Sequence, residues 1–460
     1  MPEEVGSNAL PARPKFFLRS LDNARFRWLV LILIGATVPP AFALLLVINP
    51  MFHQIVPGDL AVYLKAASQV HSGTDPYASW LAEHSVDPTR RVGYIYPPLV
   101  AWLLSPSTTL PPMAVFVGLA VLDLIALVAF ALLMARGLRV NGTQALLFSL
   151  LVSLAFFPVQ ENFKWGQVNL LLLAPCSVWF VGWIEGRDVL AGTSLGLSIA
   201  VKLLQAPVLV LVVLTSKFRM LITCLLTVLA LFLIASPQLL PEYVTRVLPE
   251  LNVSTGYTAN LAPIAFFARL FQPSSAFANA QLVPEVARIA ATLASVITIV
   301  VSARVILLSR HAATSPSVRS LQAACALAMA PLVSTIDWPA HLALLLIPMA
   351  ALLDWSVRRR RPAYAIAVLV SWLLLGPAQQ VLWTVADNPG QLGALAFSLL
   401  WFLSQSASVA LFILWGATAL ALEHEANEFL AEREGLSSAR GRLGFVKMAK
   451  AAWPRRPQGF

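Results

Sequence analysis

Charged residues are scarce in this sequence. Asp, Glu, Lys and Arg account for 12% of its 460 residues and hydrophobic residues for 58%, whereas about 25% of the residues in soluble domains are charged. This composition excludes an ordinary soluble protein and predicts an all-α polytopic membrane protein. The net charge is +10, but the basic residues are spread over the short gaps between apolar runs, so no nucleic-acid partner is expected.

Cysteine and the short motifs of soluble enzymes are scarce as well. Cys176, Cys224 and Cys325 all lie inside apolar segments, where we expect packing residues rather than disulfides or metal ligands. The sequence has no Gly-rich phosphate loop, zinc spacing, Ser-His-Asp signal or tandem repeat. No metal and no cofactor are therefore expected. The first apolar run lacks a small-residue cleavage site, so we expect it to remain as a membrane anchor.

Long apolar runs, in contrast, are plentiful. A helix needs about 20 residues to cross the apolar core of a bilayer, and a short or tilted one somewhat fewer. This length predicts about twelve spans, near residues 28–49, 113–135, 144–158, 168–184, 188–201, 203–215, 219–237, 286–309, 320–336, 341–355, 363–382 and 394–422. The proline-rich stretch 97–111 is too short to cross, so we expect a re-entrant or interfacial segment there.

The basic residues indicate an orientation. They precede the first span and occupy alternate loops, at Arg136, Arg139, Arg187, Lys217, Arg219, Arg310, Arg319 and Arg358–Arg361, so we expect these loops in the cytoplasm. The expected organisation is a cytoplasmic segment 1–27, a membrane domain 28–422 and a cytoplasmic tail 423–460. The tail is typical of a solvated helix followed by a basic arm that anionic membrane lipids attract. The opposite face then collects Asp59, Lys202 and the loops 161–169, 237–284, 337–341 and 387–391.

The stretch 57–98 follows the first predicted span and is the most polar part of the first three hundred residues after the N-terminal arm. Leu60, Tyr63, Leu64 and Ala67 have the spacing of a short amphipathic helix. Asp59 is its natural N-cap, and Gly73 can close it. As a cap alone, Asp59 would contribute about 1 kcal/mol to stability. The alternative is a catalytic carboxylate, which the helix N-terminus would keep ionised.

Three other polar segments are expected on the same face. The run ENFKWGQVN, residues 161–169, carries amides, an indole and a carboxylate that suit sugar hydroxyls, or else its Trp165 is an interfacial anchor. Lys202 lies between two apolar runs, where it either reaches the lipid headgroups or pairs with a phosphate. His341, which follows Asp337 and Trp338, is either structural or part of a site shared with Asp59.

Five motifs, taken in order, resemble glycosyltransferase family 87 of the GT-C superfamily. They are GDLAVYLKAASQVHSGTDPY, YIYPPLVAWLLSP, KWGQVNLLLLAP, AGTSLGLSIAVKLLQAPVLVL, and a tryptophan and a histidine before LALLLIP, within about residues 50 to 350. The resemblance implies a GT-C fold in a bacterial plasma (inner) membrane, with a catalytic external loop after the first helix. It makes Asp59 the catalytic aspartate and His341 the histidine after the ninth span. One histidine stands there, whereas the family has a tighter His-rich group.

The resemblance also implies a reaction. A sugar, mannose or alternatively arabinofuranose, moves from a polyprenyl-phosphate donor to a lipid or glycan acceptor outside the cytoplasm, with inversion. Lys202, Arg90 and Arg91 would bind the donor phosphate, and Asp59 would take the acceptor's proton. The expected sugar and acceptor ligands are Tyr63, Tyr77, Tyr96, Trp165, Gln167, Asn169 and Trp338. Two other classes stay open: a secondary transporter, whose inverted repeats are not evident, and a non-catalytic lipid-flipping or scaffold protein.

Overall fold

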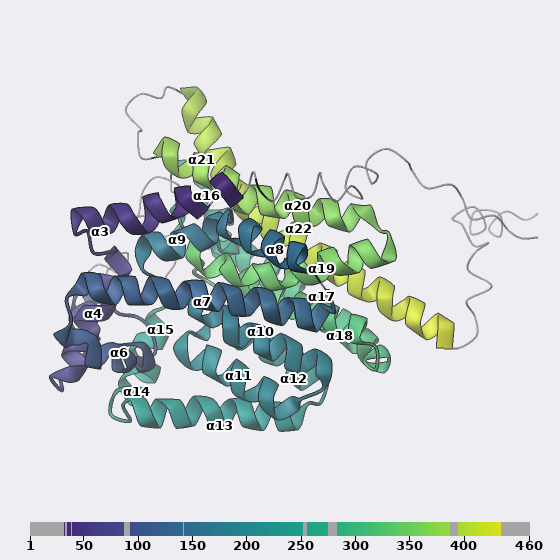
Figure 1. Ribbon diagram of the computed structural model, residues 1–460, viewed down its shortest axis with the longest axis horizontal. Helices are drawn as coiled ribbons and strands as arrows, with labels where there is room; N and C mark the ends of the chain where they lie inside the picture. The colour runs from purple at the N-terminus through teal and green to yellow at the C-terminus, as the bar shows by residue number, and fades with distance from the viewer. Residues whose placement is uncertain are drawn as a thin grey trace, which may run out of the picture.

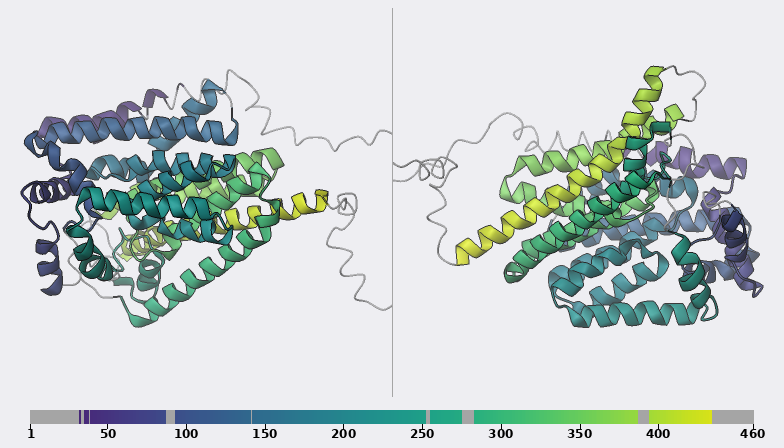
Figure 2. Two further views of the ribbon diagram at one scale, coloured as in Figure 1. Left: turned by 90° about the horizontal axis from the view of Figure 1, so that it is seen from below. Right: turned by 180° about the vertical axis from the view of Figure 1, so that it is seen from behind.

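The computed structural model describes residues 32, 35–37, 39–86, 93–140, 142–251, 255–274, 283–386 and 394–433. Every regular element in these residues is a helix, which confirms the all-α prediction. Most of the long helices run roughly along the long axis of the molecule, and one end of α22 (Ala394–Arg433) projects beyond the rest (Figures 1 and 2).

Seven helices of the described chain are long and apolar enough to cross a membrane, which makes this a multi-pass membrane protein. They span Gly35–His53, Pro112–Leu138 (α7), Phe218–Ala235 (α13), Glu285–Ala312 (α17, Glu285–Ser309, and η6), Pro339–Arg359 (η8, Pro339–Leu345, and α19, Leu346–Arg359), Pro362–Leu382 (α20, Pro362–Leu375, and part of α21, Pro377–Ala386) and Ser398–Leu430. Each coincides with a predicted span.

The other predicted spans fall on shorter helices. These are α8 (Thr143–Leu154), α10 (Asn169–Glu185), α11 (Asp188–Val201), η3 with α12 (Leu203–Val208 and Leu209–Leu214) and α18 (Pro316–Met329). Fourteen helical residues, as in α11, extend only about 21 Å, less than the core of a bilayer. The count of about twelve spans therefore stays a prediction.

The remaining short helices complete the fold. They are η1 (Leu44–Ile48), α3 (Asn49–His53), α4 (Gly58–His71), α5 (Ala78–Val86), α6 (Pro98–Leu104), η2 (Ser105–Thr109), α9 (Phe157–Trp165), α14 (Leu239–Glu242), η4 (Tyr243–Val247), α15 (Leu248–Glu250), α16 (Pro263–Phe271), η6 (Arg310–Ala312) and η7 (Ala330–Val333). As expected for the stretch 97–111, α6 and η2 are too short to cross, and both pack against α4.

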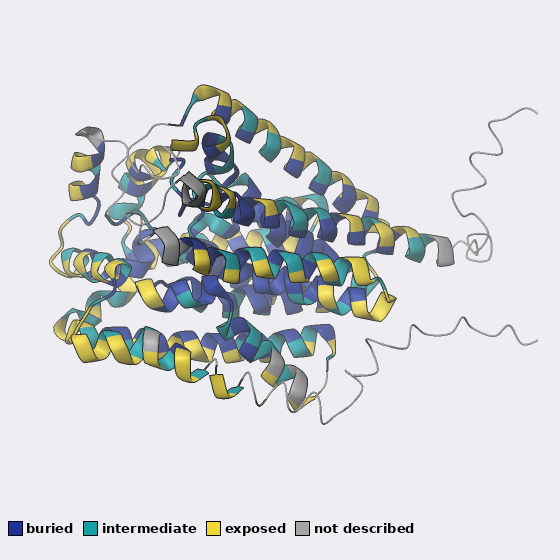
Figure 3. Cartoon of the chain, turned by 90° about the horizontal axis from the view of Figure 1, so that it is seen from above, coloured by how far each residue is buried: buried dark blue, intermediate teal, exposed yellow. Residues whose placement is uncertain are grey.

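Burial separates central from peripheral helices (Figure 3). The η8–α19 span is 78% buried, whereas the spans of α13 and α17 are 22% and 28% buried. The exposed side chains of the peripheral helices are large and apolar, among them Leu226 and Ile234 of α13 and Ile297 and Val300 of α17. Apolar surface of this extent is typical of a membrane-facing belt rather than of a soluble surface.

Two glycines let α11 pack closely on α13. A Cβ at Gly192 would lie 2.4 Å from the carbonyl oxygen of Met220, and one at Gly196 would lie 2.6 Å from that of Cys224. Small residues four apart allow two helix backbones to approach in this way inside a membrane. The cysteines are free and buried, which confirms their prediction as packing residues.

The beginning of the predicted tail is part of the fold rather than a solvated helix. The helix α22 continues without a break past Leu422 to Arg433. Glu425 is buried and accepts hydrogen bonds from Arg359 Nη2 at 2.6 Å and Trp355 Nε1 at 2.8 Å. The expectation of a fully solvated tail helix is therefore wrong at this position, because the ion pair and the indole bond hold the carboxylate against α19.

Candidate active site

Asp59 lies in the first turn of α4 and does not cap the helix. The N-cap residue is Pro57, and no side chain caps α4, so the expected N-cap role is wrong. The helix begins two residues earlier than expected, at Gly58 instead of Leu60, which places Asp59 inside the first turn. Its Oδ2 atom instead accepts a hydrogen bond from Nε2 of Gln167. The carboxylate is thus directed at the segment that follows α9.

The turn after α9 brings Gln167 to this position. Gly166 has a φ angle of 64°, in the left-handed region. A Cβ at Gly166 would lie 2.7 Å from the Cβ of Leu60 and 3.2 Å from that of Pro57. Backbone conformation and close contact with α4 therefore both favour glycine here. The turn is a fixed connection that holds Gln167 beside Asp59.

A chain of side-chain amides continues from Gln167. Its Oε1 accepts hydrogen bonds from Tyr63 Oη at 3.0 Å and from Asn169 Nδ2 at 3.1 Å. Asn169 Nδ2 also donates to Asn162 Oδ1 at 3.0 Å, and Asn162 Nδ2 donates to the carbonyl oxygen of Ala340 at 2.8 Å. Because each amide has one donor and one acceptor end, these partners fix the orientation of all three.

Lys202 joins this amide chain to His341. It lies between α11 and η3, where its ammonium nitrogen is 2.8 Å from Asn169 Oδ1 and 2.8 Å from His341 Nε2. The same nitrogen lies 4.7 Å from the centre of the Tyr96 ring. The side chain is buried, which lowers the pKa of Lys202 to about 7 despite the raising effect of Asp59 and Asp337. Near neutral pH the lysine is therefore divided between its charged and neutral forms.

Burial also perturbs the carboxyl groups near Lys202. Desolvation raises the pKa of Asp59 above its usual value, and the Gln167 hydrogen bond and the Lys202 charge oppose this rise. The pKa of Asp337 is raised well above its usual value by complete burial. Its Oδ1 is 3.7 Å from His341 Nδ1, and neither carboxyl oxygen has a hydrogen-bond partner in the described part of the chain. Titratable groups with opposing shifts in one place are typical of a functional site.

A buried arginine fixes the backbone around Asp337. Asn260 Oδ1 accepts a hydrogen bond from the Asp337 N–H at 3.0 Å, and the Asp337 carbonyl accepts one from Leu261 N–H at 2.7 Å. Arg269 in turn donates to the Asn260 carbonyl at 2.8 Å and to Gln405 Oε1 of α22 at 3.0 Å. Arg269 thus connects the Asp337 segment to α22.

The predicted tyrosines have different positions. Tyr63 and Tyr96 belong to the network, through Gln167 and Lys202 respectively, and their rings are in edge-to-face contact with centroids 5.1 Å apart. Tyr77 lies behind it, fully buried, and donates to the Tyr96 carbonyl at 2.9 Å. Tyr94 donates to the Pro97 carbonyl at 2.6 Å. Tyr77 and Tyr94 therefore support the backbone that presents Tyr96, and direct contact of Tyr77 with a sugar stays a prediction.

The predicted tryptophans flank the network. Trp165 is 41% exposed, and its Nε1 donates to Glu161 Oε2 at 2.8 Å. Trp338 is half-buried, and its backbone N–H lies 3.4 Å from His341 Nδ1. Their ligand roles stay predictions. Arg90 and Arg91 lie outside the described residues, as does the loop 387–391.

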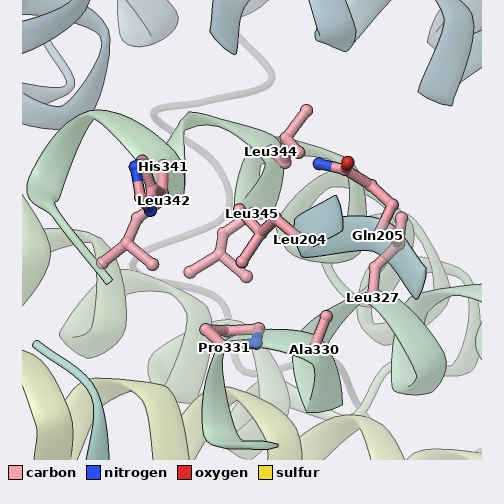
Figure 4. A pocket seen from close by; sticks show the side chains of 9 residues that line it. All are labelled: Leu204, Gln205, Leu327, Ala330, Pro331, His341, Leu342, Leu344 and Leu345. Atoms are coloured by element: carbon pink, nitrogen blue, oxygen red, sulfur yellow. The ribbon is translucent and has the colours of Figure 1, made fainter. Parts of the chain in front are cut away.

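A small pocket adjoins the far side of His341. Figure 4 shows His341 and Gln205 at its two ends, with Leu204, Leu342 and Leu345 among its apolar lining residues. Gln205 is buried, and both polar atoms of its amide lack a partner within the described structure. No group of three or more His, Cys, Asp or Glu side chains in the described residues is placed to hold a metal ion.

Sequence reasoning did not assign roles to four residues around the site, although one of them, Asn162, lies in the polar run 161–169. Asn162, Gln205, Asn260 and Arg269 are buried polar residues that bridge or border the network. Gln205 and Arg269 stand in the apolar runs KLLQAPVLV and PIAFFARLF. A polar residue inside such a run is costly unless it has partners. That cost was the available signal, and it applied to these two residues as it did to Lys202.

Comparison with known families gives one match. The model of glycosyltransferase family 87 matches residues 94–335, just over half of the 460 residues. The matched range contains Tyr96, Gln167, Asn169 and Lys202, but it begins after Asp59 and ends before His341. A search of the curated proteins gives no match.

Proposed function

Because the chain belongs to glycosyltransferase family 87, whose members are membrane glycosyltransferases, we propose that it transfers mannose from a polyprenyl-phosphate donor to a lipid or glycan acceptor. The proposed site is the network around Asp59 and Lys202. One observation carries the proposal: a continuous chain of hydrogen bonds runs from Asp59 through Gln167 and Asn169 to Lys202 and His341. A proton acceptor and a phosphate ligand are thereby held in one site.

The transfer needs two kinds of assistance. The acceptor hydroxyl attacks the anomeric carbon, the bond from that carbon to the phosphate oxygen breaks, and its electron pair leaves with the phosphate. Asp59 takes the hydroxyl proton as general base, while Lys202 neutralises the departing phosphate, with His341 as a further donor. Attack opposite the leaving group inverts the anomeric centre. The amides of Gln167 and Asn169 and the ring of Tyr96 suit the sugar.

The electrostatics of the site support these roles. A carboxylate whose pKa is raised by burial holds a proton more tightly than an ordinary aspartate, which makes Asp59 a better base. Burial lowers the pKa of Lys202 to about 7, and a phosphate beside it would raise this pKa. Binding of the donor would therefore convert Lys202 to its charged form. The charged lysine is then present when the phosphate leaves and needs stabilisation.

The finer topology belongs to the same proposal. We place the network on the non-cytoplasmic side of a bacterial plasma membrane, within a GT-C domain of about twelve spans covering residues 28–422, between the segment 1–27 and the tail 423–460. The donor-phosphate roles of Arg90 and Arg91 are part of it. The basic loops support this orientation because positively charged loops stay in the cytoplasm.

Transfer by the purified full-length protein tests the proposal. Radiolabelled polyprenyl-phosphate mannose and polyprenyl-phosphate arabinofuranose are offered separately, with a lipid extract of the host as acceptor. We expect labelled product from the mannose donor. If only the arabinofuranose donor gives product, the transferred sugar is arabinofuranose instead of mannose, and the proposed mechanism is unchanged. No transfer from either donor by folded protein would contradict the donor class.

The general base is tested by Asp59→Asn. Asparagine retains an oxygen that can accept the Gln167 hydrogen bond, so the fold should be kept, while loss of the base should slow transfer by about 10² to 10⁴. Donor binding should survive. Asp75→Asn is the matched control, because Asp75 caps a turn through the Tyr77 N–H at 2.8 Å and should change transfer by less than a few-fold. An Asp59→Asn protein as active as this control would remove Asp59 from the mechanism.

A further inference from the structure

The helix α4, which carries Asp59, lies near the start of α7, and the end of α7 lies on the other side of the molecule (Figure 1). A polar hollow lies at that end of α7. It has a volume of about 380 Å³ and lies between the end of α7, the start of α18, the end of α19 and Glu425 of α22. Three arginines line it, Arg139, Arg358 and Arg359. Both α7 and α19 belong to candidate spans, so a hollow at their ends lies where lipid headgroups are expected.

The acids of this hollow are already paired. Asp354 Oδ1 accepts a hydrogen bond from Arg358 Nε at 2.8 Å, and Glu425 Oε1 accepts one from Arg359 Nη2 at 2.6 Å. Arg139 is different, because its side chain forms no hydrogen bond or ion pair with any described residue. The lining therefore carries one positive charge that no carboxylate in the hollow neutralises.

Two more sets of donors face the same space. The helix α18 begins here with Pro316, which has no N–H, and no side chain caps it, so the first N–H that it can offer to an anion in the hollow is that of Ser317. Ser320, in the next turn, also lines the hollow, is only 7% exposed and has no hydrogen-bond partner among the described residues. Its hydroxyl oxygen is accessible from the hollow rather than fully buried, so a ligand can supply the missing partner. Its position beside the free helix end and Arg139 indicates that a ligand oxygen supplies one.

We propose that this hollow binds the phosphate of an anionic lipid headgroup. A phosphodiester has the required properties: a single negative charge for Arg139, and oxygens that accept from the start of α18 and from Ser320. The apolar surface of the adjoining spans suits the acyl chains of the same lipid. The hollow is thus a second phosphate site, at the end of the bundle opposite the proposed glycosyl-transfer site, and it does not depend on the reaction.

The experiment measures lipid binding by the purified full-length protein. Native mass spectrometry compares phosphatidylglycerol with phosphatidylcholine on the wild type, Arg139→Gln, Ser320→Ala and Arg219→Gln. Arg219 is the matched control, because it is an exposed arginine without a partner in the described structure and lies outside the hollow. Arg139→Gln should weaken phosphatidylglycerol binding about 5-fold. Ser320→Ala should weaken it less, and Arg219→Gln and the phosphatidylcholine affinities should not change.

Competition identifies the source of the phosphate. Glycerol phosphate added in millimolar excess should leave the lipid bound if a headgroup is the ligand. If glycerol phosphate displaces the lipid from the wild type and stabilises it against heat, but does not stabilise Arg139→Gln, the site takes a soluble phosphate compound. Equal lipid affinity of the wild type and Arg139→Gln would overturn the proposal. Equal losses in Arg139→Gln and Arg219→Gln would also overturn it, since surface charge alone would explain them.

Discussion

At Lys202, the cost of burying an ammonium group opposes the benefit of a charge for a phosphate ligand. The side chain has three kinds of partner, the Asn169 oxygen, the His341 ring nitrogen and the Tyr96 ring, but no carboxylate within hydrogen-bond distance. Hydrogen bonds to neutral groups offset only part of the desolvation cost. This explains a pKa of about 7 for Lys202 and leaves its protonation sensitive to an arriving anion.

Donor affinity should therefore depend on pH. Below pH 7 Lys202 is already charged, and the donor binds the ammonium form directly. Above pH 7 binding has to take up a proton, so affinity should fall by up to about tenfold per pH unit. The phosphodiester of the donor keeps its charge over this range, so the change belongs to the protein. Donor titrations of the purified protein between pH 6 and 9 measure it.

Two variants separate Lys202 from other titrating groups. Lys202→Arg keeps its charge at every pH used, so its donor affinity should be nearly independent of pH. Lys202→Gln has no charge and should bind the donor about 10- to 100-fold more weakly at pH 6. If Lys202→Arg keeps the wild-type fall in affinity above pH 7, another group is responsible for it.

At the scale of elements, the packing of α11 on α13 determines where Lys202 lies, because Lys202 directly follows α11. Gly192→Ala should push the two helices apart, since its Cβ would meet the Met220 carbonyl oxygen at 2.4 Å. Overpacking of this kind costs about 1–3 kcal/mol. We expect a lower Tm and weaker donor binding together. Gly416→Ala in α22 is the control, because nothing lies within 4 Å of its added Cβ; equal Tm values for the two variants would contradict the close contact.

A second element-scale prediction concerns Arg269, which joins the segment before α16 to α22. Arg269→Met removes the hydrogen bonds that Arg269 donates to the Asn260 carbonyl and to Gln405 Oε1, both of which are buried. The loss should cost about 1–3 kcal/mol of stability. Because Asn260 holds the Asp337 backbone, surviving protein should also transfer sugar more slowly, with less change in donor affinity. Thermal unfolding and the split between kcat and KM test this. An Arg269→Met protein of wild-type stability would contradict the role.

At the scale of the whole molecule, composition and the length of the apolar runs predicted the features that a bilayer requires of a protein. The all-α class and the seven long spans follow from the cost of unpaired backbone groups in lipid, which holds regardless of tertiary detail. The short helices were harder to judge. The predicted span 144–158 divides at Phe156 into α8 and α9, and hydropathy does not record such a break.

In the site, too, the energetic cost of placing polar groups near apolar runs could be recognised from the sequence, whereas the contacts between those groups could not. Lys202 could be selected because a charge between two apolar runs is expensive. Asp59 could be selected because it stands at a helix start in the polar stretch after the first span, and His341 because it was expected on the same face. Their connection through Gln167, Asn169 and Asn162 depends on the Gly166 turn and on contacts between residues far apart in sequence. The N-cap assignment of Asp59 failed for a local reason, a two-residue difference in where α4 begins.

The orientation of the whole molecule in the membrane can be tested with single cysteines. The native Cys176, Cys224 and Cys325 are buried, so an impermeant thiol reagent should label the wild type weakly. Ser72 and Lys164 are exposed at the end of the molecule that carries the proposed site, and Arg219 and Arg310 are exposed in basic loops.

Ser72→Cys and Lys164→Cys should react in intact cells, because the basic loops remain in the cytoplasm. Arg219→Cys and Arg310→Cys should react only after the membrane is permeabilised. The reverse labelling pattern would place the site on the cytoplasmic side and would contradict the proposal that the acceptor lies outside the cytoplasm. Labelling of Ser72→Cys and Lys164→Cys from opposite sides would contradict the network itself, because Asp59 and Gln167, which lie near these positions in sequence, share a hydrogen bond and have to lie on the same side of the bilayer.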